Sequence, residues 1–375
     1  MPFQSGNADG SRESVVFFCT SVVPKRGMTA YIRTTRLLAR SHLKTAMRES
    51  TCQRRITLTG HGGPGQLRLI ESALPPPGPG EVRVRQRAIG VNFVDVYFRT
   101  GVYALPAFPS GLGVEAAGMV EAIGEGVDDA WLGRRVAYAG PPIGAYANVR
   151  NLPVAQLACL PANVDDDTAA AILLRGLTAH MLFAHVRPLR AGDVVLVHAA
   201  AGGLGLVLAQ WASALGARVI GTVGSDEKAT LAHAHGTERT VIHTREDFVA
   251  ATRDFTNGRG ADFVIDGIGG ATFDRSLDAL APFGMAASIG QVAGDVAAID
   301  MARLHASRSI AVSRPGVFRF VADSERYREG CQAVFDRLAT GLRVRISERL
   351  PLADAARAHQ LLESGRSAGS LLLVP

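Results

Sequence analysis

A glycine-containing turn at residues 200–205 has the residue types and spacing that bind a phosphate anion. A buried apolar run, VVLVHA, precedes the turn, and an apolar stretch of helical length, LGLVLAQWASALG, follows it. Glycines let the backbone approach a pyrophosphate closely, and a helix N-terminus offers unpaired N–H groups and a partial positive charge. The order strand, turn, helix makes the match more specific than three glycine-like positions alone. We therefore predict a dinucleotide site at Ala200, Gly202, Gly203, Leu204 and Gly205.

The end of the next predicted strand indicates which dinucleotide would bind. NAD-binding proteins place a carboxylate there to hold both ribose hydroxyls, whereas this chain has Val223, followed by Gly224 and Ser225. Lys228 is the only lysine after residue 52, and it would attract a 2′-phosphate. The alternative is that Lys228 is a solvated residue of a first helical turn, and the nearby Asp226 favours this alternative. We predict NADPH as the cofactor, bound partly by Gly224, Ser225 and Lys228.

Two further glycines stand where later strands end, Gly267 after Asp266 and Gly290 before Gln291. In an open parallel sheet the ligand lies outside the carboxyl ends of the strands. Glycine at these points would permit close approach to the nicotinamide and its ribose. The alternative for each glycine is a simple strand-ending turn.

The elements that must position these residues alternate between strand and helix over residues 193–309. This alternation is typical of α/β proteins with a parallel, doubly wound sheet of the Rossmann class. The predicted strands are residues 194–199, 217–223, 239–243, 261–268 and 284–290, and the predicted helices are 204–216, 226–236, 246–258 and 271–282.

The chain before this region is rich in strand patterns. Residues 56–72 predict a hairpin, a proline-rich turn precedes an alternating strand, and Asp166 or Asp167 would cap a long apolar helix. After residue 310 the pattern gives two helices and two strands, which we expect to complete the first domain. The predicted domains are a β-rich domain of residues 53–176 and 310–375 and a nucleotide-binding domain of residues 177–309.

The distribution of charge argues against a nucleic-acid partner. The net charge is +6, but residues 1–52 hold eight basic and three acidic residues, so the remaining 32 and 31 leave only +1. No uninterrupted apolar run reaches the roughly 18 residues of a membrane span. The four cysteines are far apart in the chain, which predicts no disulfide and favours a reducing, cytoplasmic location.

Residues 1–52 differ in composition from the rest of the chain, because they are rich in basic and poor in acidic residues. Their basic residues recur at spacings of three and four, as in an organellar transit peptide. The favoured interpretation is an upstream start codon, with Met28 or Met47 as the real start. A genuine targeting segment and a disordered tail are the alternatives.

The chain lacks the ligands of a catalytic zinc ion, which usually needs three protein side chains. The β-rich domain has no cysteine between Cys52 and Cys159, and its only histidine before residue 180 is His61. His233 and His235 are two apart on a predicted helix and would face apart. We therefore predict no metal site.

Several segments together resemble a known family. GLGVEAAG, residues 111–118, is similar to the Gly-His-Glu-x-x-Gly turn of zinc-dependent alcohol dehydrogenases, but Val114 stands in place of the histidine. The segments QRAIGVNFVDVYFRTGVYALPAFPSGLGVEAAG, PPIGAYANV, LLRGLTAHMLF, HAAAGGLGLVLAQWASALGARVIGTVGSDEK and AGSLLLVP resemble the zinc-free, zeta-crystallin-like quinone oxidoreductases of the medium-chain dehydrogenase/reductase superfamily. The resemblance runs from about residue 54 to the C-terminus.

This resemblance implies a GroES-like first domain, a Rossmann second domain, NADPH and a homodimer. It places Asn92, Tyr97 and Tyr103 in the substrate cleft and implies that Tyr146 also faces it. Each tyrosine could instead be a core aromatic, and Asn92 could merely fix its loop. Where relatives often hold the 2′-phosphate with a tyrosine and two adjacent basic residues, this chain has His243 and a single Arg366.

The expected activity is NADPH-dependent reduction of a quinone without a metal. Without a Lewis acid, hydrogen-bond donors must stabilise charge that develops on the acceptor oxygen, which suits an acceptor that is already electron-poor. An alkenal or enone double-bond reductase is the nearest alternative. A non-catalytic role, as a structural, NADPH-binding or RNA-binding protein, is the alternative from another class.

Overall fold

The computed structural model describes residues 51–304 and 306–375. The predicted N-terminal extension therefore lies outside the described residues, except for Thr51 and Cys52. These two residues belong to β1 (Thr51–Leu58), so this strand begins two residues before the predicted domain boundary.

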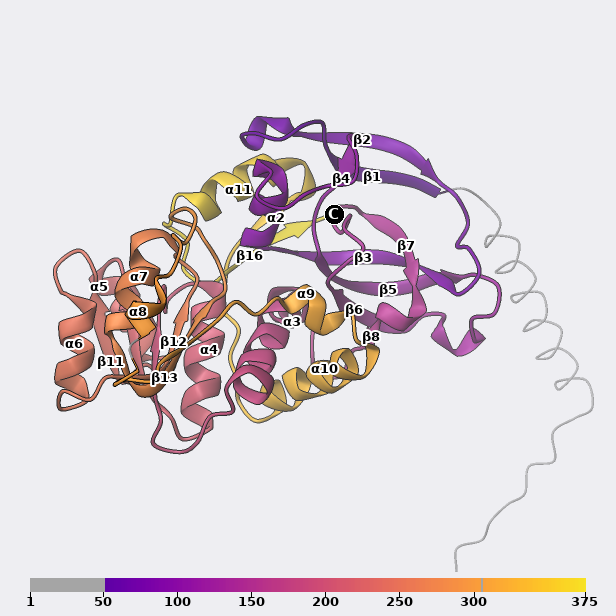
Figure 1. Cartoon of the computed structure of the whole chain (residues 1–375). Coiled ribbons are helices and arrows are strands. Elements are labelled where there is room, and N and C mark those ends of the chain that lie inside the picture. The colour runs from indigo at the N-terminus through magenta and orange to yellow at the C-terminus, as the bar shows by residue number, and fades with distance from the viewer. Residues whose placement is uncertain (1–50, 305) are drawn as a thin grey trace, which may run out of the picture. The chain divides into compact units, whose positions relative to one another are not determined.

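The predicted parallel sheet is present and has six strands in the order β11-β10-β9-β12-β13-β14 (Figure 1). All five pairings are parallel. Numbered within the sheet, this is the order 3-2-1-4-5-6, in which strand succession reverses direction between β9 and β12 and opens a crevice there. The strands are β9 (Val194–Val197), β10 (Arg218–Val223), β11 (Arg239–Ile242), β12 (Ala261–Asp266), β13 (Leu280–Ser288) and β14 (Ala311–Ser313).

Helices connect these strands, as the alternating pattern predicts. Ser225 caps α5 by accepting a hydrogen bond from the Lys228 N–H, and Asp247 caps α6 in the same way. β14 extends the parallel sheet beyond residue 309, where the domain boundary was predicted. The helices are α4 (Gly203–Ala214), α5 (Asp226–His233), α6 (Phe248–Phe255), α7 (Gly270–Asp278) and α8 (Met301–Leu304).

The β-rich part contains two further sheets. The predicted hairpin is formed by β1 and β2. The C-terminal strand β16 pairs with β3, so the chain after residue 310 returns to the β-rich part (Figure 1). The smaller sheet has the strand order β2 (Leu67–Leu74), β1, β4 (Ser110–Gly111). The larger sheet has the order β15 (Ile346–Pro351), β16 (Ser370–Val374), β3 (Glu81–Val91), β5 (Glu115–Ile123), β6 (Arg135–Ala139), β8 (Ala158–Cys159). A further strand of the larger sheet, β7 (Val149–Pro153), pairs with β3.

The long apolar helix α3 (Asp166–His180) packs against α9 (Val317–Val321) and α10 (Ser324–Ala339). The predicted cap of α3 was wrong by one residue: Asp165 accepts from the Thr168 N–H over 2.6 Å, while Asp166 pairs with Arg135. The other helices are α2 (Phe93–Thr100), α11 (Ala355–Glu363), the π-helix η4 (Met181–Val186) and the short 3-10 helices η1 (Pro64–Gln66), η2 (Asp129–Trp131), η3 (Val154–Gln156) and η5 (Leu352–Asp354).

Helix α3 and η4 together pass a membrane-span test of length and composition, with 21 residues and a mean hydropathy of 1.4. However, 83% of the apolar window is buried inside the structure. Core helices of soluble proteins pass the same test, so this helix is weak evidence for a membrane span.

Candidate active site

A cavity of about 780 Å³ lies at the carboxyl ends of β9, β10, β12 and β13 and extends to α2 and α3. Its volume falls in the range of small-molecule binding sites. The cavity brings together most of the predicted residues from the two parts of the chain: Asn92, Tyr97, Tyr103, Gly202, Gly203, Leu204, Gly205, Gly224, Lys228, His243, Gly267 and Gly290.

The glycine turn between β9 and α4 presents bare backbone to this cavity. Gly202 is the N-cap of α4, whose first residue is Gly203. A Cβ atom at Gly205 would lie 2.7 Å from the Ala200 Cα and still closer to the Ala199 carbonyl oxygen, so only glycine fits there. The buried Ala200 packs beneath the turn and does not line the cavity. The helix N-terminus is thus open to an anion, as a pyrophosphate site requires.

The end of the cavity beyond β10 is lined by Lys228 and His243. Gly224 lies close to the His243 ring, since a Cβ atom there would be 3.5 Å from its Nε2. The Lys228 ammonium donates to the Gly365 carbonyl oxygen, which ties the C-terminal segment to this end. Burial lowers the pKa of Lys228 from its ordinary value.

Two predicted cofactor residues do not line the cavity. Ser225 uses its hydroxyl as the cap of α5, and Arg366 is exposed on the segment after α11. The neighbours of Arg366, Gly365 and Ser367, do line the cavity.

The nicotinamide end is shaped by Gly267 and Gly290. The buried Asp266 carboxylate accepts from the Ile268 and Gly269 N–H groups over 2.7 and 2.9 Å, which fixes the turn after β12. A Cβ atom at Gly290 would lie 2.6 Å from the Gly267 carbonyl oxygen. Gly290 therefore allows a close approach of two backbone segments beside the cavity, whereas a Cβ atom at Gly267 would meet only the Ile289 side chain, at 3.9 Å.

Tyr97 links the two parts of the chain across the cavity. The Gln291 N–H donates to its hydroxyl oxygen over 2.8 Å, and its ring packs edge-on against Tyr103 with centroids 5.4 Å apart. Burial raises the pKa of Tyr97, so the hydroxyl keeps its proton at neutral pH. Tyr103 is more open, with 37% of its surface exposed.

Asn92 lines the cavity, but one of its contacts is structural. Its Nδ2 donates to Glu115 Oε2 over 2.8 Å, and its backbone N–H donates to Asp95 over the same distance. The side chain is thus held in one orientation by a buried carboxylate.

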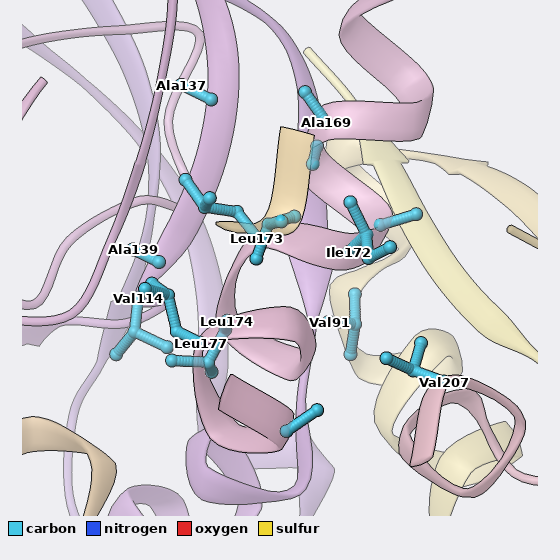
Figure 2. Close-up of a cluster of buried hydrophobic side chains, with 14 of the residues drawn as sticks. Val91, Val114, Ala137, Ala139, Ala169, Ile172, Leu173, Leu174, Leu177 and Val207 are labelled. Atoms are coloured by element: carbon cyan, nitrogen blue, oxygen red, sulfur yellow. The ribbon is translucent and has the colours of Figure 1, made fainter. Parts of the chain in front are cut away.

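Val114, at the position that corresponds to the zinc-ligand histidine, is fully buried in an apolar cluster with Ala139, Leu174 and Leu177 (Figure 2). The adjacent Glu115 is also fully buried and pairs with Arg175 over 3.5 Å. A valine and a carboxylate already paired with a guanidinium do not form a metal site.

A buried polar network continues from Glu115 behind the cavity. The Tyr146 hydroxyl donates to Asp95 over 3.0 Å and lies 3.1 Å from His359 Nε2. Burial raises the pKa of Asp95 to about 7, opposed by hydrogen bonds from Asn92 and Tyr146. The expectation that Tyr146 faces the cleft was wrong, because its ring is fully buried against Gly113.

Four charged residues that line the cavity were not predicted: Arg175, Glu246, Arg275 and Glu363. Arg175 carried a signal, because it is the only charged residue in the apolar run of residues 168–179. Glu246 accepts from the Ile242 N–H over 3.0 Å and pairs with Arg239. Its position near His243 follows from a local turn, in which its own N–H donates to the Ile242 carbonyl oxygen over 2.9 Å.

Comparison with known proteins identifies both parts of the chain. Residues 78–162 match the alcohol dehydrogenase GroES-like domain, and residues 203–335 match the zinc-binding dehydrogenase family. A quinone oxidoreductase of Pseudomonas aeruginosa is 42% identical over 86% of this chain and 99% of its own length. A 2-haloacrylate reductase of Burkholderia is 38% identical over 84% of this chain and 96% of its own length.

Solved structures agree with the sequence comparison. The Escherichia coli quinone oxidoreductase complexed with NADPH superposes with a TM-score of 0.83 and 39% identity, covering 86% of this chain and 100% of that one. The overall fold of the described residues is thus shared with this relative. The chain belongs to the quinone oxidoreductases of the medium-chain dehydrogenase/reductase superfamily.

Proposed function

We propose that this protein reduces quinones with NADPH and uses no metal ion in the reaction. The cavity residues fit the cofactor, since the glycine turn opens the N-terminus of α4 to a pyrophosphate and Gly267 and Gly290 leave backbone exposed at the other end. When bound, NADPH supplies a hydride equivalent, and with one further proton a quinone becomes a hydroquinone.

Tyr97 is the residue best suited to assist the acceptor. Its hydroxyl oxygen accepts from the Gln291 N–H, which leaves the hydroxyl proton for donation to a quinone oxygen. Tyr103 offers an exposed ring edge on which a planar acceptor would pack. Asn92, held by Glu115, would orient the acceptor through its remaining amide hydrogen.

Lys228 and His243 are the residues that we assign to the 2′-phosphate. Both line the cavity beyond β10, and the carboxylate that NAD-binding proteins carry at Val223 is missing. Glu246 lines the same end and reduces the positive charge there.

Steady-state oxidation of NADPH with 9,10-phenanthrenequinone tests the proposal. We expect turnover with the wild type and a drop in kcat of about tenfold for Tyr97→Phe, the size expected for the loss of one hydrogen bond. Tyr103→Phe is the matched control and should retain most of kcat because the ring remains. Failure of the wild type to oxidise NADPH with any quinone would refute the function.

Double-bond reduction of a conjugated acid or enal is the second candidate. The similarity to 2-haloacrylate reductase favours it, and an electron-poor double bond meets the same requirement for an acceptor that needs no metal. Parallel measurement of kcat/KM with 2-chloroacrylate, an enal and phenanthrenequinone distinguishes the two. If kcat/KM is higher for 2-chloroacrylate or the enal than for phenanthrenequinone, double-bond reduction replaces quinone reduction as the proposed activity.

We also propose a cytoplasmic homodimer that neither binds a membrane nor carries catalytic zinc. The family resemblance supports the dimer, and the buried α3 supports the absence of a membrane span. Sedimentation equilibrium of the full chain should give twice the 39.5 kDa of one protomer. A monomer at micromolar concentration would remove the dimer from the proposal.

A further inference from the structure

Three metal-ligating side chains meet on a side of α3 that does not face the cofactor cavity. His180 Nε2 lies 3.3 Å from Glu329 Oε1, His185 Nε2 lies 3.8 Å from the same oxygen, and all three potential ligand atoms are within 4.8 Å of one another. Thr178 and Met181 of the same helical segment line the cavity, whereas none of these three residues does.

The π-helix η4 is what brings the two histidines together. Residues five apart in an α-helix lie about 140° apart around its axis, so His180 and His185 would face different directions. A π-helix closes its hydrogen bonds over five residues, as the bond from the Arg187 N–H to the Leu182 carbonyl does here over 2.9 Å. The two imidazole rings consequently lie with centroids 5.3 Å apart.

The site combines a buried, unpartnered nitrogen with an open side. His180 is 8% exposed, and its Nε2 makes no hydrogen bond within the described residues, despite its closeness to Glu329. Phe320 packs edge-on against both imidazoles, with centroids 6.0 and 5.0 Å away. The Glu329 side chain is 53% exposed, so a cation can enter from solvent.

We propose that His180, His185 and Glu329 bind a divalent transition-metal ion of the zinc class. In a tetrahedral zinc site with bonds of about 2.0 Å, ligand atoms are roughly 3.3 Å apart. Here the two distances from the histidine Nε2 atoms to Glu329 Oε1 are 3.3 and 3.8 Å. A small rotation of the exposed His185 would shorten the third distance, between the two histidines. Two imidazoles and one carboxylate favour Zn²⁺, Co²⁺ or Ni²⁺ over Mg²⁺ and Ca²⁺. Water would fill the fourth position.

This site does not depend on the proposed function, because its ligands lie outside the cofactor cavity. A bound ion would join the end of α3 to α10 and should stabilise the folded protein by mass action. Its role is therefore structural, and hydride transfer would not require it.

Titration of the full chain with Co²⁺ and Zn²⁺, after removal of any polyhistidine tag, tests the proposal. We expect one equivalent of Co²⁺ with tetrahedral visible absorption and no thiolate charge-transfer band, a Kd for Zn²⁺ of about 10 µM or lower, and a higher Tm with Zn²⁺. His185→Ala and Glu329→Gln should each weaken binding at least about tenfold. His235→Ala is the matched control, since its ring contacts the Leu231 carbonyl oxygen on α5, and it should bind like the wild type.

The exposed Glu329 makes Glu329→Gln the decisive variant, because it changes one atom type without disturbing the core. Equal affinity of the wild type and Glu329→Gln would overturn the proposal. No saturable binding up to about 1 mM would also overturn it and would leave the cluster as a histidine–carboxylate contact without a metal.

Discussion

The glycine turn after β9 and the buried polar network behind β5 border the same cavity, but they are built in opposite ways. The turn works through missing side chains, because a Cβ atom at Gly205 would collide with the backbone. The network works through side chains from distant parts of the chain, with Glu115 from β5, Arg175 from α3 and Asn92 before α2.

This difference makes the shape of the nucleotide site independent of the residue at position 114. The nucleotide site needs only a local backbone shape, which no change at Val114 disturbs. At the metal position, Val114 joins the apolar core, and Arg175 is the cation that the buried Glu115 pairs with. The following substitutions test whether the two regions are separable, in order of decreasing effect.

Glu115→Gln should have the largest effect and should act on stability. It leaves the Arg175 guanidinium buried without a counter-charge, which costs about 3–5 kcal/mol in the free energy of unfolding. Urea unfolding monitored by circular dichroism measures the loss. Glu121→Gln, which breaks the more exposed pair with Arg85, is the control and should cost under about 1 kcal/mol. Equal losses of unfolding free energy in the two variants would show that the buried pair contributes no more than the exposed pair.

Gly205→Ala should act on the cofactor rather than on the network. The added methyl group must displace the backbone of the turn, and we expect NADPH affinity to fall about 100-fold, or roughly 2.7 kcal/mol. Fluorescence titration with NADPH measures the affinity. Gly65→Ala is the control, because a Cβ atom there meets nothing within 4 Å. Unchanged NADPH binding by Gly205→Ala would place the pyrophosphate elsewhere.

Lys228→Ala should weaken NADPH binding about tenfold and leave NADH binding nearly unchanged, because only NADPH carries the 2′-phosphate. The same titration with both cofactors measures this difference. Arg366→Ala, on the exposed segment after α11, should have a smaller effect. If the wild type binds NADH and NADPH equally, the assignment of Lys228 fails.

Asp95→Asn should have the smallest effect, and it should depend on pH. The folded-state pKa of Asp95 is raised from 3.8 to about 7, so the folded protein holds this proton more tightly than the unfolded chain. Stability from this group is therefore present at low pH and is lost as pH rises toward 7. Because asparagine cannot ionise, the stability of Asp95→Asn relative to wild type should increase by at least about 1 kcal/mol from pH 5 to pH 8.

Urea unfolding at several pH values measures this change. The exposed Asp129, replaced by asparagine, is the control, and its difference from wild type should stay flat over the same range. A flat difference for Asp95→Asn as well would mean that the network holds Asp95 ionised throughout.

The sequence by itself determined what depends on neighbours in the chain. The period of the apolar residues predicted the parallel sheet, and the spacing of Gly202 and Gly205 predicted the turn that leads into α4, because both properties arise within one strand–turn–helix unit. The hairpin of β1 and β2 was predicted for the same reason.

Only the tertiary structure decided the partners of buried polar groups. Tyr146 was expected in the cleft and instead bonds Asp95 and lies beside His359, more than 200 residues away in the chain. Likewise, the π-helix sets His180 and His185 on one side and α10 brings Glu329 to them. A buried donor or acceptor must find a partner wherever the fold supplies one, and no local pattern records that choice.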